Sequence, residues 1–164
     1  MKKILGLCLV MGLVGWSATS HSKVLWQNTQ TGMSVSQVEK IFPQAKQTEP
    51  RYETMLGDGS QRLLEIKNYK INIYYYDAEF YFNRGKLTQV TLALQDDQPI
   101  GAALEALTDA FRVKYGKEVT SREDRFSMEK KWLTKDKTIV KLSVHGRYLT
   151  VIYHARDELD LNKL

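Results

Sequence analysis

Apolar residues follow two different spacings along the chain, one typical of strands and one typical of helices. From Arg62 to Leu94 the chain is rich in β-branched and aromatic residues and has no proline, which favours paired strands. Three later segments show a similar alternation, and they are Arg125–Leu133, Thr138–Val144 and Tyr148–His154. The pattern therefore predicts two groups of about three antiparallel strands.

A glycine-containing turn sets the register that we expect in the first group. A three-residue loop over residues 83–85 (NRG) would place Phe82 opposite Lys86. Alternation then assigns the apolar side chains to one face, which carries Tyr76, Ala78, Phe80, Phe82, Val90, Leu92 and Leu94. The opposite face carries Asp77, Glu79, Tyr81, Gln89 and Thr91. We therefore expect one face in the core and one face in contact with solvent.

The last two predicted strands are joined by Gly146-Arg147, which fits a two-residue turn. This turn would place Val144 opposite Leu149. The pairs that follow would be Leu142 with Val151 and Val140 with Tyr153. This register brings apolar side chains together on a single face of the second group.

One helix is expected before each group of strands. Ser34 and Gln37 form a capping box, and Pro43 ends this first helix after about two turns. The second helix is expected to begin at Pro99 and to end at about Tyr115. We predict an α+β fold of two tandem helix-plus-three-stranded antiparallel sheet units, 33–95 and 99–154, with the helices on one face of the sheet. Together they would form a single domain over 23–164.

The first 22 residues have the character of a secretory signal peptide. Lys2 and Lys3 precede an apolar run from Ile4 to Val14, and small residues follow at a possible cleavage site near Ser20 or Ser22. The apolar run is shorter than the roughly 20 residues that span a bilayer. We therefore expect export to the periplasm or the medium, and no membrane span after removal of the signal.

Charge and cysteine content exclude several kinds of site. The chain has 24 Lys and Arg against 19 Asp and Glu, and loss of residues 1–22 removes two lysines and no acid. This small basic excess, without a dense Lys/Arg block, argues against nucleic-acid binding. The single cysteine, Cys8, lies in the predicted signal, so residues 23–164 offer no disulfide, thiolate metal site or cysteine nucleophile.

The opening of the first helix resembles that of two families of exported bacterial proteins. Residues 32–38 (GMSVSQV), followed by residues 41–43 (IFP), are similar to the helix opening of the BamE/SmpA type and of the β-lactamase-inhibitor-protein type. The resemblance implies a capped helix before an antiparallel sheet, repeated in the inhibitor type, and a non-enzymatic protein that contacts other envelope proteins. The chain lacks the lipid-bearing cysteine of the first type and the cysteine pairs of the second, and no family binding residue is carried over.

Few residues are candidates for catalysis or for metal binding. His145 and His154 have no third nitrogen or sulfur ligand, so no metal site and no cofactor are expected. Asp77 and Glu79 would share one face of a strand, and with His154 they are the residues that a small hydrolase could use. A solvated strand face explains the carboxylates equally well, and we do not predict an enzyme.

Aromatic residues are concentrated between Tyr69 and Phe82 in the first group of strands, and by alternation half of them cannot share the core face. Tyr75 and Tyr81 would lie on the outer face with Glu79, so these three form the candidate partner-binding surface. Packing of the rings against neighbouring strands is the alternative, and it applies equally to Trp26 and Trp132.

These observations together predict a secreted or periplasmic protein-binding module that contacts another envelope or secreted protein. An inhibitor or immunity protein that blocks one hydrolase or toxin is the alternative, because the same fold would allow it. A small hydrolase is the third possibility. No oligomeric state is predicted.

Overall fold

The structure is a computed structural model that describes residues 22–155. Apart from Ser22, the predicted signal peptide over residues 1–22 lies outside the described residues, as does the charged tail over 156–164. The elements, in chain order, are α1 (Val35–Ile41), β1 (Lys46–Gln47), the 3-10 turn η1 (Tyr52–Thr54), β2 (Gln61–Ile71), β3 (Tyr74–Asn83), β4 (Lys86–Leu94), α2 (Ile100–Tyr115), β5 (Thr120–Glu123), β6 (Ser127–Leu133), β7 (Thr138–His145) and β8 (Tyr148–Ala155).

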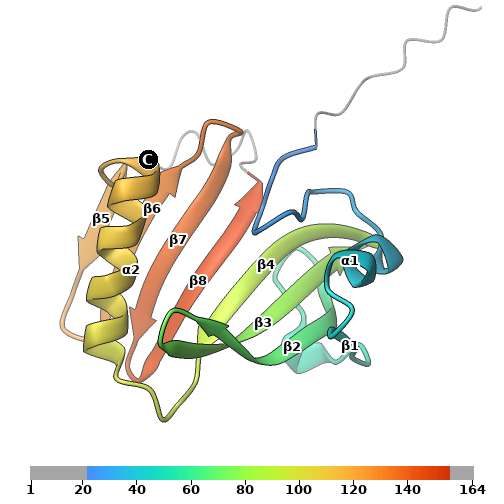
Figure 1. Ribbon diagram of the computed structural model, residues 1–164, viewed down its shortest axis with the longest axis horizontal. Helices are drawn as coiled ribbons and strands as arrows, with labels where there is room; N and C mark the ends of the chain where they lie inside the picture. The colour runs from blue at the N-terminus through green and yellow to red at the C-terminus, as the bar shows by residue number, and fades with distance from the viewer. Residues whose placement is uncertain (1–21, 156–164) are drawn as a thin grey trace, which may run out of the picture.

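The strands form one open antiparallel sheet of eight strands in the order β1-β2-β3-β4-β8-β7-β6-β5 (Figure 1). The α+β class is confirmed, but the division into two tandem three-stranded units is wrong. The last strand of each half, β4 and β8, pair with each other from Gln89↔His154 to Ala93↔Thr150. Two short polar strands, β1 and β5, extend the sheet at its edges and were not predicted. The two halves therefore share a single sheet.

Helix α1 begins where the sequence predicts. The Ser34 hydroxyl accepts a hydrogen bond from the Gln37 amide, and the Gln37 side chain accepts one from the Ser34 amide, so the capping box is complete. The helix ends at Ile41 before Pro43. Helix α2 runs from Ile100 to Tyr115, and Gly116 follows it at a φ of 86°, a backbone conformation that favours glycine. Neither described helix is long and apolar enough to cross a membrane.

The registers of the two predicted hairpins have different outcomes. The β7–β8 register is confirmed, with Val144 opposite Leu149 and the following pairs as expected. The β3–β4 turn contains two residues rather than three, because Arg84 also takes a positive φ, and Asn83 pairs with Lys86. A bulge after Leu87 shifts the register by one further residue. The two shifts add to an even number, so the side chains beyond the bulge keep their predicted faces. Between the turn and the bulge, Leu87 pairs with Phe82 and lies in the core, where the predicted register would place it on the outer face.

One row of buried side chains crosses the sheet from β2 to β6. Each member is the register partner of the next, and none is more than 5% exposed: Leu64, Phe80, Val90, Tyr153, Val140 and Trp132. The row confirms that one face of the sheet is core. It also shows that the core is continuous across the seam between β4 and β8.

The two helices lie over opposite ends of this row (Figure 1). Beside α1, the Phe42 ring lies 5.5 Å from Phe80, and on α2 the Phe111 ring lies 5.3 Å from Trp132, measured between ring centroids. The indole N–H of Trp132 also donates to the Gly116 carbonyl at the end of α2, over 3.0 Å. Each helix is therefore attached to its half of the sheet through aromatic contacts.

The segment before α1 joins the core through Trp26. Its ring stacks on Phe42 at 5.3 Å and meets the edge of Tyr69 at 5.0 Å. Trp26 is 5% exposed and Trp132 is fully buried, so both tryptophans, for which packing and binding were open alternatives, pack in the core.

We expect Trp26→Ala to lower the free energy of unfolding by about 3 to 5 kcal/mol, because it removes a buried ring that touches three others. Tyr52→Ala is the control, since that ring is 83% exposed and its loss should change the free energy by less than about 0.5 kcal/mol. Urea denaturation measures both. A loss below about 1 kcal/mol for Trp26→Ala would show that the segment before α1 is not part of the cooperative core.

Candidate functional site

The three residues predicted to bind a partner share the outer face of β3, but their environments differ. Tyr75 is 38% exposed, and the Lys70 ammonium lies 5.7 Å from its ring centroid. Tyr81 is 7% exposed, and its hydroxyl donates to Glu79 over 2.8 Å. Glu79 is also bound by Arg62. Only Tyr75 of the three therefore offers much ring surface, and binding through this surface stays a prediction.

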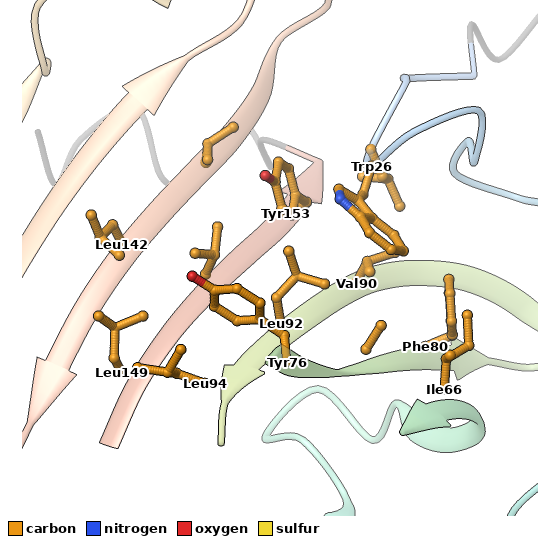
Figure 2. Packing of buried hydrophobic residues seen from close by; sticks show 14 of the residues in the cluster. Trp26, Ile66, Tyr76, Phe80, Val90, Leu92, Leu94, Leu142, Leu149 and Tyr153 are labelled. Atoms are coloured by element: carbon orange, nitrogen blue, oxygen red, sulfur yellow. The ribbon is translucent and has the colours of Figure 1, made fainter. Parts of the chain in front are cut away.

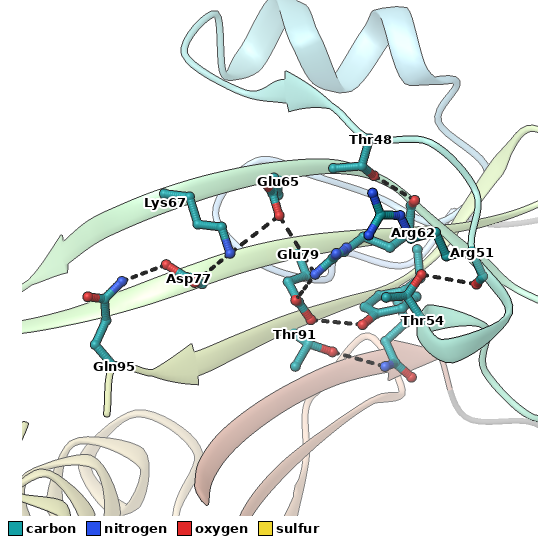
Figure 3. A network of polar contacts seen from close by, with 12 residues as sticks. Thr48, Arg51, Thr54, Arg62, Glu65, Lys67, Asp77, Glu79, Thr91 and Gln95 are labelled. Atoms are coloured by element: carbon teal, nitrogen blue, oxygen red, sulfur yellow. Dashed lines mark hydrogen bonds and ion pairs between the residues drawn. The ribbon is translucent and has the colours of Figure 1, made fainter. Parts of the chain in front are cut away.

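Ion pairs cover the outer face around these residues (Figure 3). The Lys67 ammonium lies 2.7 Å from an Asp77 carboxylate oxygen and 3.5 Å from one of Glu65. The Arg62 guanidinium lies between the carboxylates of Glu79 and Glu65, and one of its nitrogens is 3.7 Å from a Glu65 oxygen. Cations and carboxylates alternate from β2 to β3, so each charge has an opposite neighbour. This part of the face consequently presents little unpaired charge to a partner.

Asp77 is held in its ionised form. Burial would raise the pKa of Asp77, but hydrogen bonds from Lys67, from the Gln95 amide and from the Asn68 N–H outweigh it, and the pKa is lowered. A general acid that works near neutral pH needs the opposite shift. The environment of Asp77 is therefore that of a structural ion pair.

The side chains considered for hydrolysis do not meet at one point. His154 pairs with Gln89, whereas Asp77 lies level with Thr150, four residues away along β8. His145 is exposed at the end of β7, where it flanks the turn as expected. Within residues 22–155, no group of three or more His, Cys, Asp or Glu is placed to hold a metal ion.

The opposite face of the sheet carries a cavity of about 480 Å³ where the helices leave the core open. Its floor is formed by Tyr76, Leu92 and Tyr153, which come from β3, β4 and β8 and lie next to one another (Figure 2). This volume is within the range of ligand-binding clefts. The cavity therefore lies on the seam that joins the two halves of the sheet.

Helix α2 and two loop segments form the walls of the cavity. Ala106 and Ala110 face it from successive turns of α2, with Leu107 and Phe111 beside them. Both alanines are exposed, so the helix wall is low and the cavity opens to solvent as a groove. The opposite wall consists of the segment 24–28 and the tip of the β2–β3 hairpin. We call this cavity the central groove.

Two tyrosine hydroxyls in the central groove have no hydrogen-bond partner in the described part of the chain. The side chains of Tyr76 and Tyr153 are 1% and 5% exposed, and neither hydroxyl makes a hydrogen bond within residues 22–155, although both oxygens reach solvent. Burial raises the pKa of Tyr76 to about 12 and also raises that of Tyr153, with smaller contributions from neighbouring tyrosines. Both hydroxyls are therefore protonated near neutral pH and available as hydrogen-bond donors.

The sequence placed Tyr76 and Tyr153 on the core face but did not single them out. A signal was present, since a phenol on a core face needs a hydrogen-bond partner for its hydroxyl. The pattern could not show which core positions the helices leave uncovered. The groove residues on α2, Ala106 and Ala110, were missed for the same reason.

Comparison of the chain with protein-family models, with curated proteins and with solved structures finds no match. The similarity of residues 32–43 to the BamE/SmpA and inhibitor types therefore remains a resemblance of the helix opening.

We expect Tyr76→Phe and Tyr153→Phe to leave the melting temperature unchanged or to raise it, because each removes a hydroxyl without a partner. Tyr81→Phe is the matched variant, since it removes a hydroxyl that donates to the Glu79 carboxylate, and it should cost about 1 to 2 kcal/mol. Calorimetry of the three variants tests this contrast. A strong destabilisation by Tyr76→Phe or Tyr153→Phe would mean that its hydroxyl has a partner.

The lowered pKa of Asp77 predicts a pH-dependent contribution to stability. This contribution is complete above the unfolded pKa of about 3.9 and is lost as the pH falls through the lower folded pKa. Asp77→Asn should therefore lower stability at pH 7 by roughly 1 kcal/mol. The difference from the unsubstituted protein should narrow near pH 2, with the exposed Glu53→Gln as the control. An equal difference at both pH values in melting experiments would contradict this assignment.

Proposed function

We propose that this protein is a non-enzymatic binding module of the cell envelope, and that another envelope or secreted protein inserts a segment into the central groove. The observation that carries the proposal is the groove itself. The helices and the segment before α1 do not fill the space above Tyr76, Leu92 and Tyr153, and a cavity of about 480 Å³ remains there. Apolar side chains with a few converging polar groups are what binding clefts in proteins have in common.

The contrast between the two faces supports the groove over the outer face. On the outer face, Arg62, Lys67, Asp77 and Glu79 already bind one another, so a partner would have to displace these contacts. In the groove, Tyr76 and Tyr153 retain unused donors next to apolar surface. Tyr75 remains the outer-face residue with ring surface to offer, so the experiment below includes it.

The alternative is an inhibitor or immunity protein that blocks one hydrolase or toxin. The groove is compatible with either role, since both require a surface that recognises a protein. The identity of the captured partner distinguishes them: an assembly component supports the first role, and a hydrolase or toxin supports the second.

The proposal predicts that filling the groove abolishes binding without unfolding the protein. Ala110→Trp places a large ring in the groove from an exposed position on α2, and its cost to the helix is small. Val113→Trp is the control on the same helix, because Val113 is 90% exposed and does not line the groove. We expect Ala110→Trp to lose the protein captured from envelope extract, with capture by Val113→Trp unchanged and similar melting temperatures.

Tyr75→Ser separates the two candidate surfaces in the same capture experiment. If the groove is the binding site, this variant retains the partner. Loss of capture by Tyr75→Ser together with retention by Ala110→Trp would move the binding site to the outer face and would overturn the groove proposal.

A further inference from the structure

The unpartnered hydroxyls of Tyr76 and Tyr153 indicate what the occupant of the central groove must offer. Buried polar groups in proteins nearly always have a hydrogen-bond partner. These two side chains are more than nine-tenths buried, line the groove and make no hydrogen bond within residues 22–155, while their hydroxyl oxygens remain in contact with solvent. Within the described residues, the fully buried polar side-chain atoms without a partner are Arg62 Nε and the Thr108 hydroxyl, and neither residue lines the groove. The two phenol hydroxyls are therefore free to bind an occupant of the groove in place of water.

The polar part of the lining favours an occupant with an oxygen acceptor. Tyr74 and Tyr115 also line the groove and add two more phenol groups to its lining. Each phenol hydroxyl can donate one hydrogen bond and can also accept one, but it is the stronger donor because its oxygen lone pair is delocalised into the ring. A ligand that supplies a carbonyl oxygen would satisfy a donor on the floor of the groove.

The charges in the lining favour a neutral acceptor over a carboxylate. Lys114 and Asp136 are the two charged residues in the described lining, one of each sign. The ammonium that would attract a carboxylate is therefore offset by a carboxylate that would repel it. A main-chain carbonyl is the neutral acceptor that every peptide segment carries.

The apolar part of the lining requires a large apolar side chain next to that carbonyl. Leu92 lies on the floor between the two tyrosines, and Leu107, Phe111 and Trp26 line the walls. A volume of about 480 Å³ has room for a large side chain together with its flanking peptide groups.

We propose that the central groove binds an extended segment of the partner protein through one large apolar side chain, whose neighbouring main-chain carbonyl accepts hydrogen bonds from Tyr76 and Tyr153. This inference rests on the proposed function and specifies the chemistry of the segment. It assigns the hydroxyls of the two tyrosines a role in recognition. Packing in the core would not require these hydroxyls.

Three small probes that share an aromatic body test the inference on the purified chain. Acetophenone carries a neutral carbonyl, ethylbenzene carries none, and benzoate carries a charged carboxylate. Their affinities are measured by titration, with amide chemical shifts as the readout. We expect acetophenone to bind about threefold to tenfold more tightly than ethylbenzene, as one or two hydrogen bonds would give, and more tightly than benzoate.

Variants connect this preference to the two hydroxyls. In the double variant Tyr76→Phe/Tyr153→Phe, acetophenone and ethylbenzene should bind equally, while Tyr75→Phe on the outer face should keep the preference. Ala110→Trp should abolish the binding of all three probes, which places them in the groove.

Several results would overturn the inference. These are a preference that survives in the double variant, tighter binding of benzoate, probe binding that Ala110→Trp leaves intact, or no binding of any probe. None of them alters the capture experiment, so partner capture that is lost in Ala110→Trp would still support the proposed function. Conversely, capture that Ala110→Trp does not affect would reject the proposed function even where acetophenone binds as expected.

Discussion

The pairing of β4 with β8 is the contact on which the rest of this structure depends. It joins two strand groups through residues about 60 positions apart, from Gln89↔His154 to Ala93↔Thr150, and so creates one continuous core face. A single helix on each half is too narrow to cover so wide a sheet. The centre of the core, where Tyr153 lies in the buried row, consequently stays accessible from the groove. The same contact produces the sheet and the opening above it.

Local features of the fold could be predicted from the sequence because short-range chemistry determines them. The capping box at Ser34 and the glycine turn at Gly146 each depend on a few neighbouring residues, and both are confirmed. In the β3–β4 hairpin, the turn length and the bulge were not predicted, but the core and outer faces of the strands beyond the bulge were predicted correctly. Burial of one face requires the alternation, and the chain adjusts turn and bulge to preserve it.

Non-local features could not be predicted, for equally physical reasons. Nothing in β4 or β8 identifies the other as its neighbour, because any strand with one apolar face could pair there. The edge strands β1 and β5 were missed because Lys46–Gln47 and Thr120–Glu123 are short and polar, with no alternation to detect. Two aspects of the candidate site could not be predicted. Tyr75, Glu79 and Tyr81 were placed on the correct face, but the contacts that these side chains make depend on tertiary packing. The groove on the other face depends on tertiary packing as well.

The tyrosine hydroxyls on the two faces of the sheet have different surroundings. On the outer face, the hydroxyl of Tyr81 is bound by a carboxylate, and that carboxylate is bound by Arg62. On the core face, Tyr76 and Tyr153 occupy positions where phenylalanine would fill the same space without an unmet donor. Neither hydroxyl makes a hydrogen bond within residues 22–155, so packing of the described chain does not account for it. Both line the central groove, and the proposed recognition of a partner segment would give each hydroxyl a role.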